Sequence, residues 1–200
     1  SVTGGSAGIG RATAAAVARA GGLVYEFSRR EIPQGGGRHL SVDVTREEAV
    51  QDAVNQILSE EGRIDIVVNC AGFGISGAVE FTEPEAAKGQ FDVNFFGCVT
   101  VNRAVLPILR RQGGGRILLI SSVAASAHIP FQAYYSASKA ALESYACALA
   151  NEVRPFHIAV TAVALGDVAT GFTHPRQKSL PCAAVDGGRT GRRVAAMLRV

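Results

Sequence analysis

The stretch Thr3-Gly4-Gly5-Ser6-Ala7-Gly8-Ile9-Gly10 decides the fold, and the alanine-rich run 11–18 follows it at once. Glycines at positions 4, 8 and 10 suit a turn from a buried strand into a helix, where the backbone must pass close to a pyrophosphate held at the helix N-terminus. The stretch therefore predicts a dinucleotide-binding α/β unit. A glycine-rich loop without a function is the alternative, because a glycine pattern alone is weak support.

The rest of the chain alternates short apolar runs with amphipathic segments, which is typical of βαβ units that build a parallel sheet. We expect strands to end at or near Thr3, Ser28, Val42, Cys70, Ser121 or Ser122, and Leu165. We expect helices over 11–20, 46–60, 84–92, 97–111, 133–153 and 189–199. Gly21-Gly22 ends the first helix, and Thr45 with Glu48 has the spacing of a capping box for the second.

The composition fits one globular domain. The chain has 200 residues, 48% of them apolar, and 23 glycines, which allows a substantial core. The net charge of +3 comes without a basic tract, so we expect no nucleic-acid partner. No apolar stretch is long enough for a membrane span and no signal peptide is evident, which favours a cytoplasmic protein.

The cysteines suggest no metal or redox centre. They are widely spaced and form no C-x-x-C pair, standing at Cys70, Cys98, Cys147 and Cys182. We expect reduced, mostly buried thiols.

Both ends of the chain look truncated. Only Ser1 and Val2 precede the glycine turn, whereas a buried strand normally has about five residues. The segment of about 166–188, rich in proline and glycine towards its end, is interpreted as a substrate lid.

Tyr135 and Lys139 are four residues apart in an alanine-rich segment that we expect to be helical, so they share one face. A phenol with an ordinary pKa of about 10 is a poor acid-base group near neutral pH, but a neighbouring ammonium favours the phenolate and lowers that pKa. The pair is therefore a candidate acid-base site. A core-edge tyrosine beside a solvated lysine is the other interpretation of this spacing.

The Thr-Gly-x-x-x-Gly-x-Gly pattern of residues 3–10, together with the Tyr-x-x-x-Lys pattern of residues 135–139, resembles the short-chain dehydrogenase/reductase family. Residues 69–72, Asn-Cys-Ala-Gly, are similar to the family's Asn-Asn-Ala-Gly motif. Asn94 matches its active-site asparagine, and Ser122 lies thirteen residues before the tyrosine, at the family's catalytic spacing. Taken singly, these residues could also cap a helix, close a turn or end a strand. The resemblance implies a Rossmann-like, doubly wound parallel sheet.

The resemblance also implies a mechanism and a set of contacts. Tyr135 exchanges a proton with the substrate oxygen, Ser122 hydrogen-bonds that oxygen, and Lys139 holds the nicotinamide ribose, while Asn94 orders a water of a proton relay. No metal is needed. The implied cofactor-binding residues are Gly4, Ser6, Gly8, Ile9, Gly10, Ser28, Arg29, Asp43, Val44, Asn69, Ala71, Gly72, Tyr135, Lys139, Gly166, Val168 and Thr170.

The end of the second expected strand bears on the choice of cofactor. Ser28 stands where an acidic residue would bind the ribose of NAD, and Arg29 can pair with a 2′-phosphate, which favours NADP with NAD still possible. Arg29 and Arg30 could instead be a solvated strand end. Glu26 complicates the choice, because strand alternation places it on the same face as Ser28.

The substrate is expected to be a small-molecule carbonyl or secondary alcohol. The chain looks most like family members that act on hydroxysteroids, retinoids or other bulky apolar carbonyls, although Leu165 replaces the usual proline of a Pro-Gly turn. An apolar pocket could be lined by residues that could equally be ordinary core: Phe73, Ile75, Ile129, Phe131 and Phe172.

A second function class stays open beside the enzyme. A dinucleotide-sensing regulator on this fold would bind NADP without turnover, but such proteins typically lose the Tyr or the Lys that this chain retains. The segment 140–153 of the helix expected over 133–153 carries small residues and could pack against a second copy, so we expect a homo-oligomer.

Overall fold

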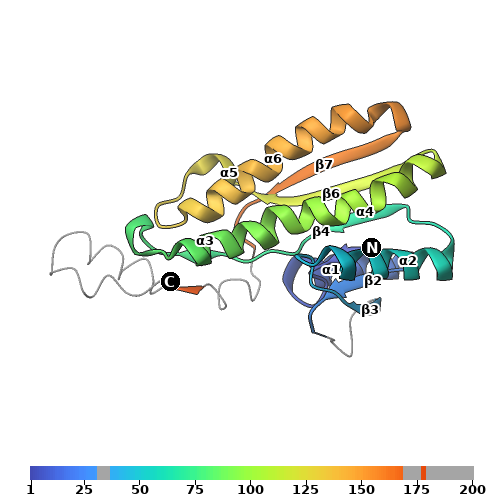
Figure 1. The fold of residues 1–200 in the computed structure, drawn as a ribbon, viewed down its shortest axis with the longest axis horizontal. Helices are drawn as coiled ribbons and strands as arrows, with labels where there is room; N and C mark the ends of the chain where they lie inside the picture. The colour runs from blue at the N-terminus through green and yellow to red at the C-terminus, as the bar shows by residue number, and fades with distance from the viewer. Residues whose placement is uncertain (31–36, 169–176, 179–200) are drawn as a thin grey trace.

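The computed structural model describes residues 1–30, 37–168 and 177–178, and these form a single α/β domain around one parallel sheet (Figure 1). The sheet has six strands in the order β3-β2-β1-β4-β6-β7. Their bounds are β1 Val2–Thr3, β2 Tyr25–Ser28, β3 Arg38–Ser41, β4 Ile66–Asn69, β6 Gly115–Ser122 and β7 Ile158–Leu165. A short parallel pair, β5 Ile75–Ser76 with β8 Gln177–Lys178, lies apart from this sheet.

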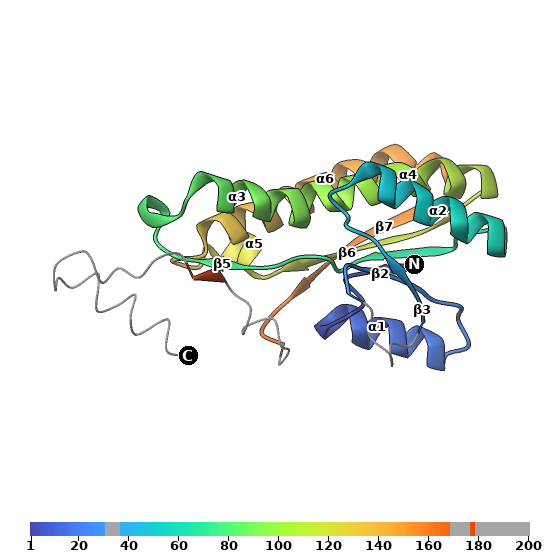
Figure 2. The same ribbon diagram turned by 60° about the horizontal axis from the view of Figure 1, so that its bottom comes forward.

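Helices cover both faces of the sheet unequally, as Figure 2 shows. The helices are α1 Gly8–Arg19, α2 Glu47–Glu61, α3 Pro84–Phe91, α4 Gly97–Gln112, α5 Ala124–Ala127 and α6 Ala133–Val153. On one face α2, α4 and α6 pack on a core that includes Phe27, Val67 and Leu119. On the other face lies α1, whose Ala14 packs with Val2 and Val68. The predicted doubly wound sheet is confirmed.

The sheet reverses its winding at β1, which pairs with β2 on one side and with β4 on the other. A ligand of such a sheet binds in the crevice beyond the carboxyl ends of the strands at this switch point. Thr3, Asn69 and Ser122 end their strands at this edge. The fold therefore brings the glycine-rich turn and the central polar motifs to one place.

Most predicted boundaries agree with the structure. The strand ends at Thr3, Ser28, Ser122 and Leu165 are confirmed, and β3 and β4 each end one residue earlier than predicted. The helix predicted over 133–153 is confirmed at both ends. Gly21, at φ +83°, follows the end of α1 as expected. The helix predicted over 189–199 and most of the lid predicted over 166–188 lie outside the described residues.

Two local predictions were wrong. The capping box fails because Thr45 donates its backbone N–H and its hydroxyl to Asp43 Oδ1, at 3.0 and 2.7 Å, so α2 begins later, with Arg46 at its N-cap. The break predicted between two helices near residue 94 is absent. The π-helix Asp92–Phe96 joins α3 to α4, and the backbone keeps right-handed helical dihedrals at both junctions. Such wide turns are frequent at functional sites.

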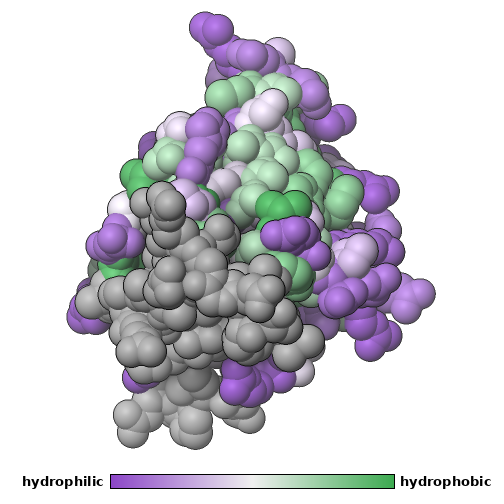
Figure 3. All heavy atoms as spheres, turned by 90° about the vertical axis from the view of Figure 1, so that its left-hand side faces the viewer, coloured by the Kyte–Doolittle hydropathy of each residue, from purple (hydrophilic) through white to green (hydrophobic). Residues whose placement is uncertain are grey.

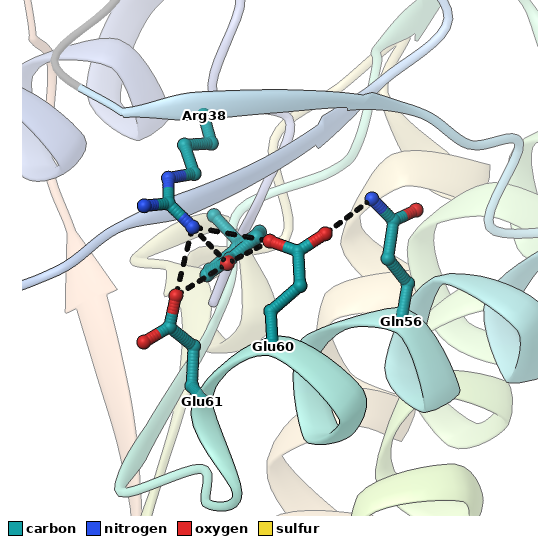
Figure 4. A network of polar contacts seen from close by, with 5 residues as sticks. Arg38, Gln56, Glu60 and Glu61 are labelled. Carbon is teal, nitrogen blue, oxygen red and sulfur yellow. Dashed lines mark hydrogen bonds and ion pairs between the residues drawn. The ribbon is translucent and has the colours of Figure 1, made fainter.

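A polar network ties the far end of α2 to the sheet (Figure 4). Tyr25 is buried as a residue, and its hydroxyl lies 2.5 Å from Glu60 Oε2 and 2.7 Å from Glu61 Oε1, while Arg38 Nη1 donates to it at 2.7 Å. Burial, with the two carboxylates, raises the pKa of Tyr25 to about 12. Carboxylates at a helix C-terminus oppose the helix dipole, and the Arg38 guanidinium offsets this. The network lies at the starts of β2 and β3, away from the crevice.

No helix in the described part of the chain is long and apolar enough to cross a membrane.

Candidate active site

The glycine-rich turn is built against the loop that follows β4. Thr3 Oγ1 accepts hydrogen bonds from the backbone N–H groups of Cys70 and Ala71, both at 3.0 Å. Gly4 has φ +66°, and a Cβ there would lie 2.9 Å from the backbone of Ala71. Only glycine combines that dihedral with such a close approach. The Thr-Gly pair therefore joins the two crevice loops.

Helix α1 begins directly after this turn and its N-terminus is open. Ala7 occupies the N-cap, which makes no side-chain hydrogen bond, and no acidic residue lies in the first turn. The first N–H groups of a helix lack partners inside it and carry a partial positive charge, so they bind anions well. Gly8, Ile9 and Gly10 stand in this first turn. The turn thus fits the pyrophosphate of a dinucleotide.

Asn94 holds the loop after β4 through hydrogen bonds to the backbone of Phe73. Its side chain is 1% exposed, and Oδ1 accepts from the Phe73 N–H at 2.9 Å while Nδ2 donates to the Phe73 carbonyl at 3.0 Å. Nδ2 also lies 3.1 Å from Ser138 Oγ, which links the clamp to α6. We call these contacts of Asn94 with Phe73 and Ser138 the Asn94 clamp. It lies within the π-helix, so the wide turn places it over the loop.

Lys139 lies across Gly72 from the Asn94 amide. A Cβ on Gly72 would be 3.1 Å from Asn94 Oδ1 and 3.8 Å from Lys139 Nζ. Lys139 Nζ donates to the Ile120 carbonyl at 2.6 Å and lies 5.9 Å from the centroid of the Tyr135 ring. The predicted pairing of Tyr135 and Lys139 on one helix face is therefore present in the structure.

Burial governs the charge of this lysine. It lowers the pKa of Lys139 to about 8, against smaller opposing contributions from the thiols of Cys98 and Cys70. Burial likewise raises the pKa of each of these two thiols to about 12, which keeps them protonated. Cys147 is exposed, so the expectation of mostly buried thiols does not hold for it, and Cys182 lies outside the described residues.

Ser122 and Tyr135 come from neighbouring elements at the same edge. Ser122 is the last residue of β6, and its Oγ accepts from the Ala124 N–H at 3.2 Å. Tyr135 stands in the first turn of α6, half-buried, and its carbonyl accepts from Ser138 Oγ at 2.8 Å. Between them, His128 and Phe131 adopt φ of 49° and 64°. Left-handed backbone at non-glycine residues is a strain that concentrates at functional sites.

The end of β2 holds the residues predicted to select the cofactor. Ser28 is buried and its Oγ donates to the Arg30 carbonyl at 2.8 Å, while Arg29 and Arg30 are exposed. Partial burial opposes ionisation of Asp43, but the hydrogen bonds from Thr45 and the charges of Arg29 and Arg46 outweigh it and lower the Asp43 pKa. Arg29 therefore lies near Asp43 at the rim of the crevice.

Glu26, two residues before Ser28, is buried against the adjacent strand. It is 5% exposed, and its Oε2 lies 2.5 Å from His39 Nδ1 on the adjacent strand. The Glu26 carboxylate, which complicated the cofactor choice, thus has His39 as a partner within the protein.

The remaining predicted contacts are more dispersed. Val44 is buried, and its Cγ2 would lie 2.6 Å from a Cβ on Gly97 at the start of α4. Gly166 and Val168 are exposed beyond the end of β7. Thr170 and Phe172 lie outside the described residues. Ser6 is half-buried in the glycine turn.

Sequence reasoning missed two supporting residues. Gln90 is fully buried, and its Nε2 donates to the Phe73 carbonyl at 3.0 Å beside the Asn94 clamp. Asn102 is also fully buried, and its Oδ1 accepts from Asn69 Nδ2 at 3.0 Å. A signal for both was present in the sequence. They are polar residues four before and eight after Asn94, which places them on the buried side of a helix.

Known proteins resemble this chain in sequence and in fold. The family model described as short chain dehydrogenase matches residues 1–181. A 3-ketodihydrosphingosine reductase of Bacteroides thetaiotaomicron is 47% identical over 179 residues, which cover 89% of this chain and 66% of that relative. Retinol dehydrogenase 8 of Bos taurus is 37% identical over 139 residues, covering 68% of this chain and 44% of the relative. The crystal structure of a short-chain dehydrogenase from Streptomyces avermitilis superposes with a TM-score of 0.79 at 35% identity, covering 89% of this chain and 68% of that one.

An open helix N-terminus at the switch point of a parallel sheet defines a Rossmann-like dinucleotide-binding protein. With the family match, the conclusion is narrower: the chain belongs to the short-chain dehydrogenase/reductase family, a family of NAD(P)-dependent oxidoreductases. It spans 66% or less of the length of the two relatives compared by sequence.

Replacing Lys139 with Met tests the burial of its ammonium. The folded-state pKa of about 8 is below the ordinary value of 10.5, so the unfolded chain binds more protons between these values and stability rises with pH there. The free-energy cost of burying the Lys139 ammonium is fully present below about pH 8 and is gone above the ordinary pKa. Between neutral pH and that pKa, we expect the unfolding free energy of the parent to rise by about 3 kcal/mol more than that of the variant.

Denaturant titrations of both proteins across this pH range measure the difference. Ionisation of Tyr25 lowers stability only as the pH rises above its ordinary pKa of 10.0, and it affects both proteins alike. Lys88→Met, which removes an exposed lysine from α3, controls for the loss of a positive charge. Parallel pH curves for the parent and Lys139→Met would show that the ammonium is not desolvated.

Proposed function

We propose that this protein transfers a hydride between NADP(H) and a carbonyl or secondary alcohol carried on a bulky apolar molecule. The observation that carries the proposal is the meeting of the Asn94 clamp, Gly72 and Lys139 beside Tyr135 at the carboxyl edge of the sheet. A buried cation next to a phenol supports proton exchange at a substrate oxygen. The open N-terminus of α1 at the same edge supports dinucleotide binding.

The residues have distinct roles in this proposal. The nicotinamide, when bound, supplies or accepts the hydride. Tyr135 donates a proton to the carbonyl oxygen during reduction and removes it from the alcohol during oxidation, and Ser122 hydrogen-bonds the same oxygen. Lys139 stabilises negative charge on the Tyr135 oxygen and binds the nicotinamide ribose. The Asn94 clamp holds the loop after β4 in place.

NADP is the proposed cofactor because of the charges at the end of β2. Ser28 brings no charge to the ribose, and Arg29 is exposed and lies near enough to Asp43 to help lower the pKa of that carboxyl. Glu26, which could have repelled a 2′-phosphate, is buried and hydrogen-bonded to His39. Guanidinium groups bind phosphate by charge-assisted hydrogen bonds.

The proposed substrate class is a ketone on a long or bulky apolar chain. The Bacteroides relative is named for 3-ketodihydrosphingosine, and the Bos taurus relative for retinol. In this chain Phe73, Ile129 and Phe131 are half-buried around the loops that flank Ser122 and Tyr135. The end of the molecule that carries α3 and α5 shows hydrophobic side chains among polar ones (Figure 3). Exposed Val79 and Val123, at 57% and 45%, add apolar surface near these loops. A steroid remains one member of this class, and the cytoplasmic location and homo-oligomer stay predictions.

Arg29→Ala tests the cofactor assignment. The parent should bind NADPH more tightly than NADH, and the variant should lose about tenfold of that preference, because a charge-assisted contact to the 2′-phosphate is removed. Calorimetric titration with both dinucleotides measures it. Arg46→Ala, which removes another cation near Asp43, is the matched control and should keep the preference. Equal or tighter binding of NADH by the parent would contradict NADP as the cofactor.

Tyr135→Phe tests the chemistry. The substitution removes the transferable proton and keeps the ring, so we expect NADPH binding to be retained while carbonyl reduction falls by roughly 100-fold or more. The decrease of NADPH absorbance with a panel of apolar ketones measures turnover. Tyr134→Phe changes the neighbouring half-buried tyrosine and should keep the parental rate. If Tyr135→Phe reduced the ketones as fast as the parent, another group would be the acid.

A further inference from the structure

A buried carboxylate lies directly beneath the glycine-rich turn. Glu26 of β2 pairs in register with Val2 of β1 and with His39 of β3. Neighbouring residues in register on parallel strands point to the same face of a sheet. Val2 packs with Ala14 of α1, so Glu26 and His39 also lie on the face that α1 covers.

Gly5 of the turn rests on the Glu26 side chain. A Cβ on Gly5 would lie 2.1 Å from Glu26 Cγ and 3.1 Å from Cδ. Any larger residue at position 5 would displace the glutamate, and any loss of the glutamate would leave the turn unsupported there. The carboxylate therefore lies beside the backbone that leads into the open N-terminus of α1.

Only one oxygen of this carboxylate has a partner in the described part of the protein. Oε2 lies 2.5 Å from His39 Nδ1, whereas Oε1 is buried and has no hydrogen-bond partner among the described residues. His39 donates to a carboxylate as the imidazolium or as the neutral ring with its proton on Nδ1. An incompletely satisfied buried carboxylate is costly, and it will bond to any N–H group it can reach.

We propose that Glu26 and His39 form a positioning pair for dinucleotide binding, an inference that rests on the proposed function. Glu26 supports the phosphate-binding turn at Gly5. His39 holds the carboxylate on the β3 side, away from the N–H groups that the pyrophosphate needs. Without His39, the carboxylate competes for those N–H groups and repels the phosphates.

The Glu26–His39 pair affects binding of the pyrophosphate, which NADPH and NADH share. Arg29 instead affects binding of the 2′-phosphate, which only NADPH carries. His39→Phe keeps a ring and removes the donor, and we expect it to weaken NADPH and NADH alike, by about tenfold. The maximal rate at saturating cofactor should change little, because neither residue contacts the reacting atoms. Glu26→Met in the His39→Phe background removes the unpaired charge, and binding should return to within about threefold of the parent.

Calorimetric titration of the parent, His39→Phe, the double variant and Glu26→Gln with NADPH and NADH tests the proposal. Glu26→Gln keeps the shape beneath Gly5 without the charge and should bind both dinucleotides at least as well as the parent. If His39→Phe does not fold, Glu26→Gln still tests the proposal. Binding of the dinucleotides by Glu26→Gln that is tenfold weaker than by the parent overturns the proposal. So does a double variant that binds no better than His39→Phe, or a His39→Phe protein with parental affinity. A parent that binds neither dinucleotide would instead refute the proposed function, and the inference with it.

Discussion

The Asn94 clamp is the interaction on which the rest of the site depends. One buried amide satisfies both backbone groups of Phe73 and reaches Ser138 on α6. An amide can do this only because it carries a donor group and an acceptor on the same plane. The π-helix supplies the extra width that places Asn94 over the loop, and Ser138 passes the constraint to the carbonyl of Tyr135. A single side chain thereby fixes the loop after β4 relative to the helix that carries the proposed acid-base pair.

Beside the clamp, across Gly72, lies a lysine that is costly to bury. Lys139 has a carbonyl partner on Ile120, and burial lowers its pKa to about 8. A desolvated ammonium interacts strongly with nearby negative charge, because little water screens it. The site thus gives up stability to keep a strong electrostatic partner beside Tyr135. The polar network at Tyr25, at the starts of β2 and β3, has no part in this and serves to join α2 to the sheet.

The sequence predicted the sheet, the helices and the grouping of the motifs, because strand ends and glycine turns are local signals. It did not predict the π-helix Asp92–Phe96, because such wide turns are rare and occur mostly as single turns within α-helices. The capping box was wrong because Asp43, two residues earlier, takes both donors of Thr45. Gln90 was missed because its role depends on a partner seventeen residues away in the chain. The pairing of Glu26 with His39 likewise required the strand order, which spacing alone does not provide.

The central claim is that Tyr135 and Lys139 couple proton exchange to hydride transfer in this site. The most direct measurement is the pH dependence of both reaction directions with one ketone–alcohol pair, with the reduction repeated on deuterated NADPH. The account predicts that reduction falls and oxidation rises to a plateau as the pH increases, with a slower rate from the deuterated cofactor. Profiles that stay flat from about pH 6 to 10, while the deuterated cofactor still slows the reaction, would contradict it.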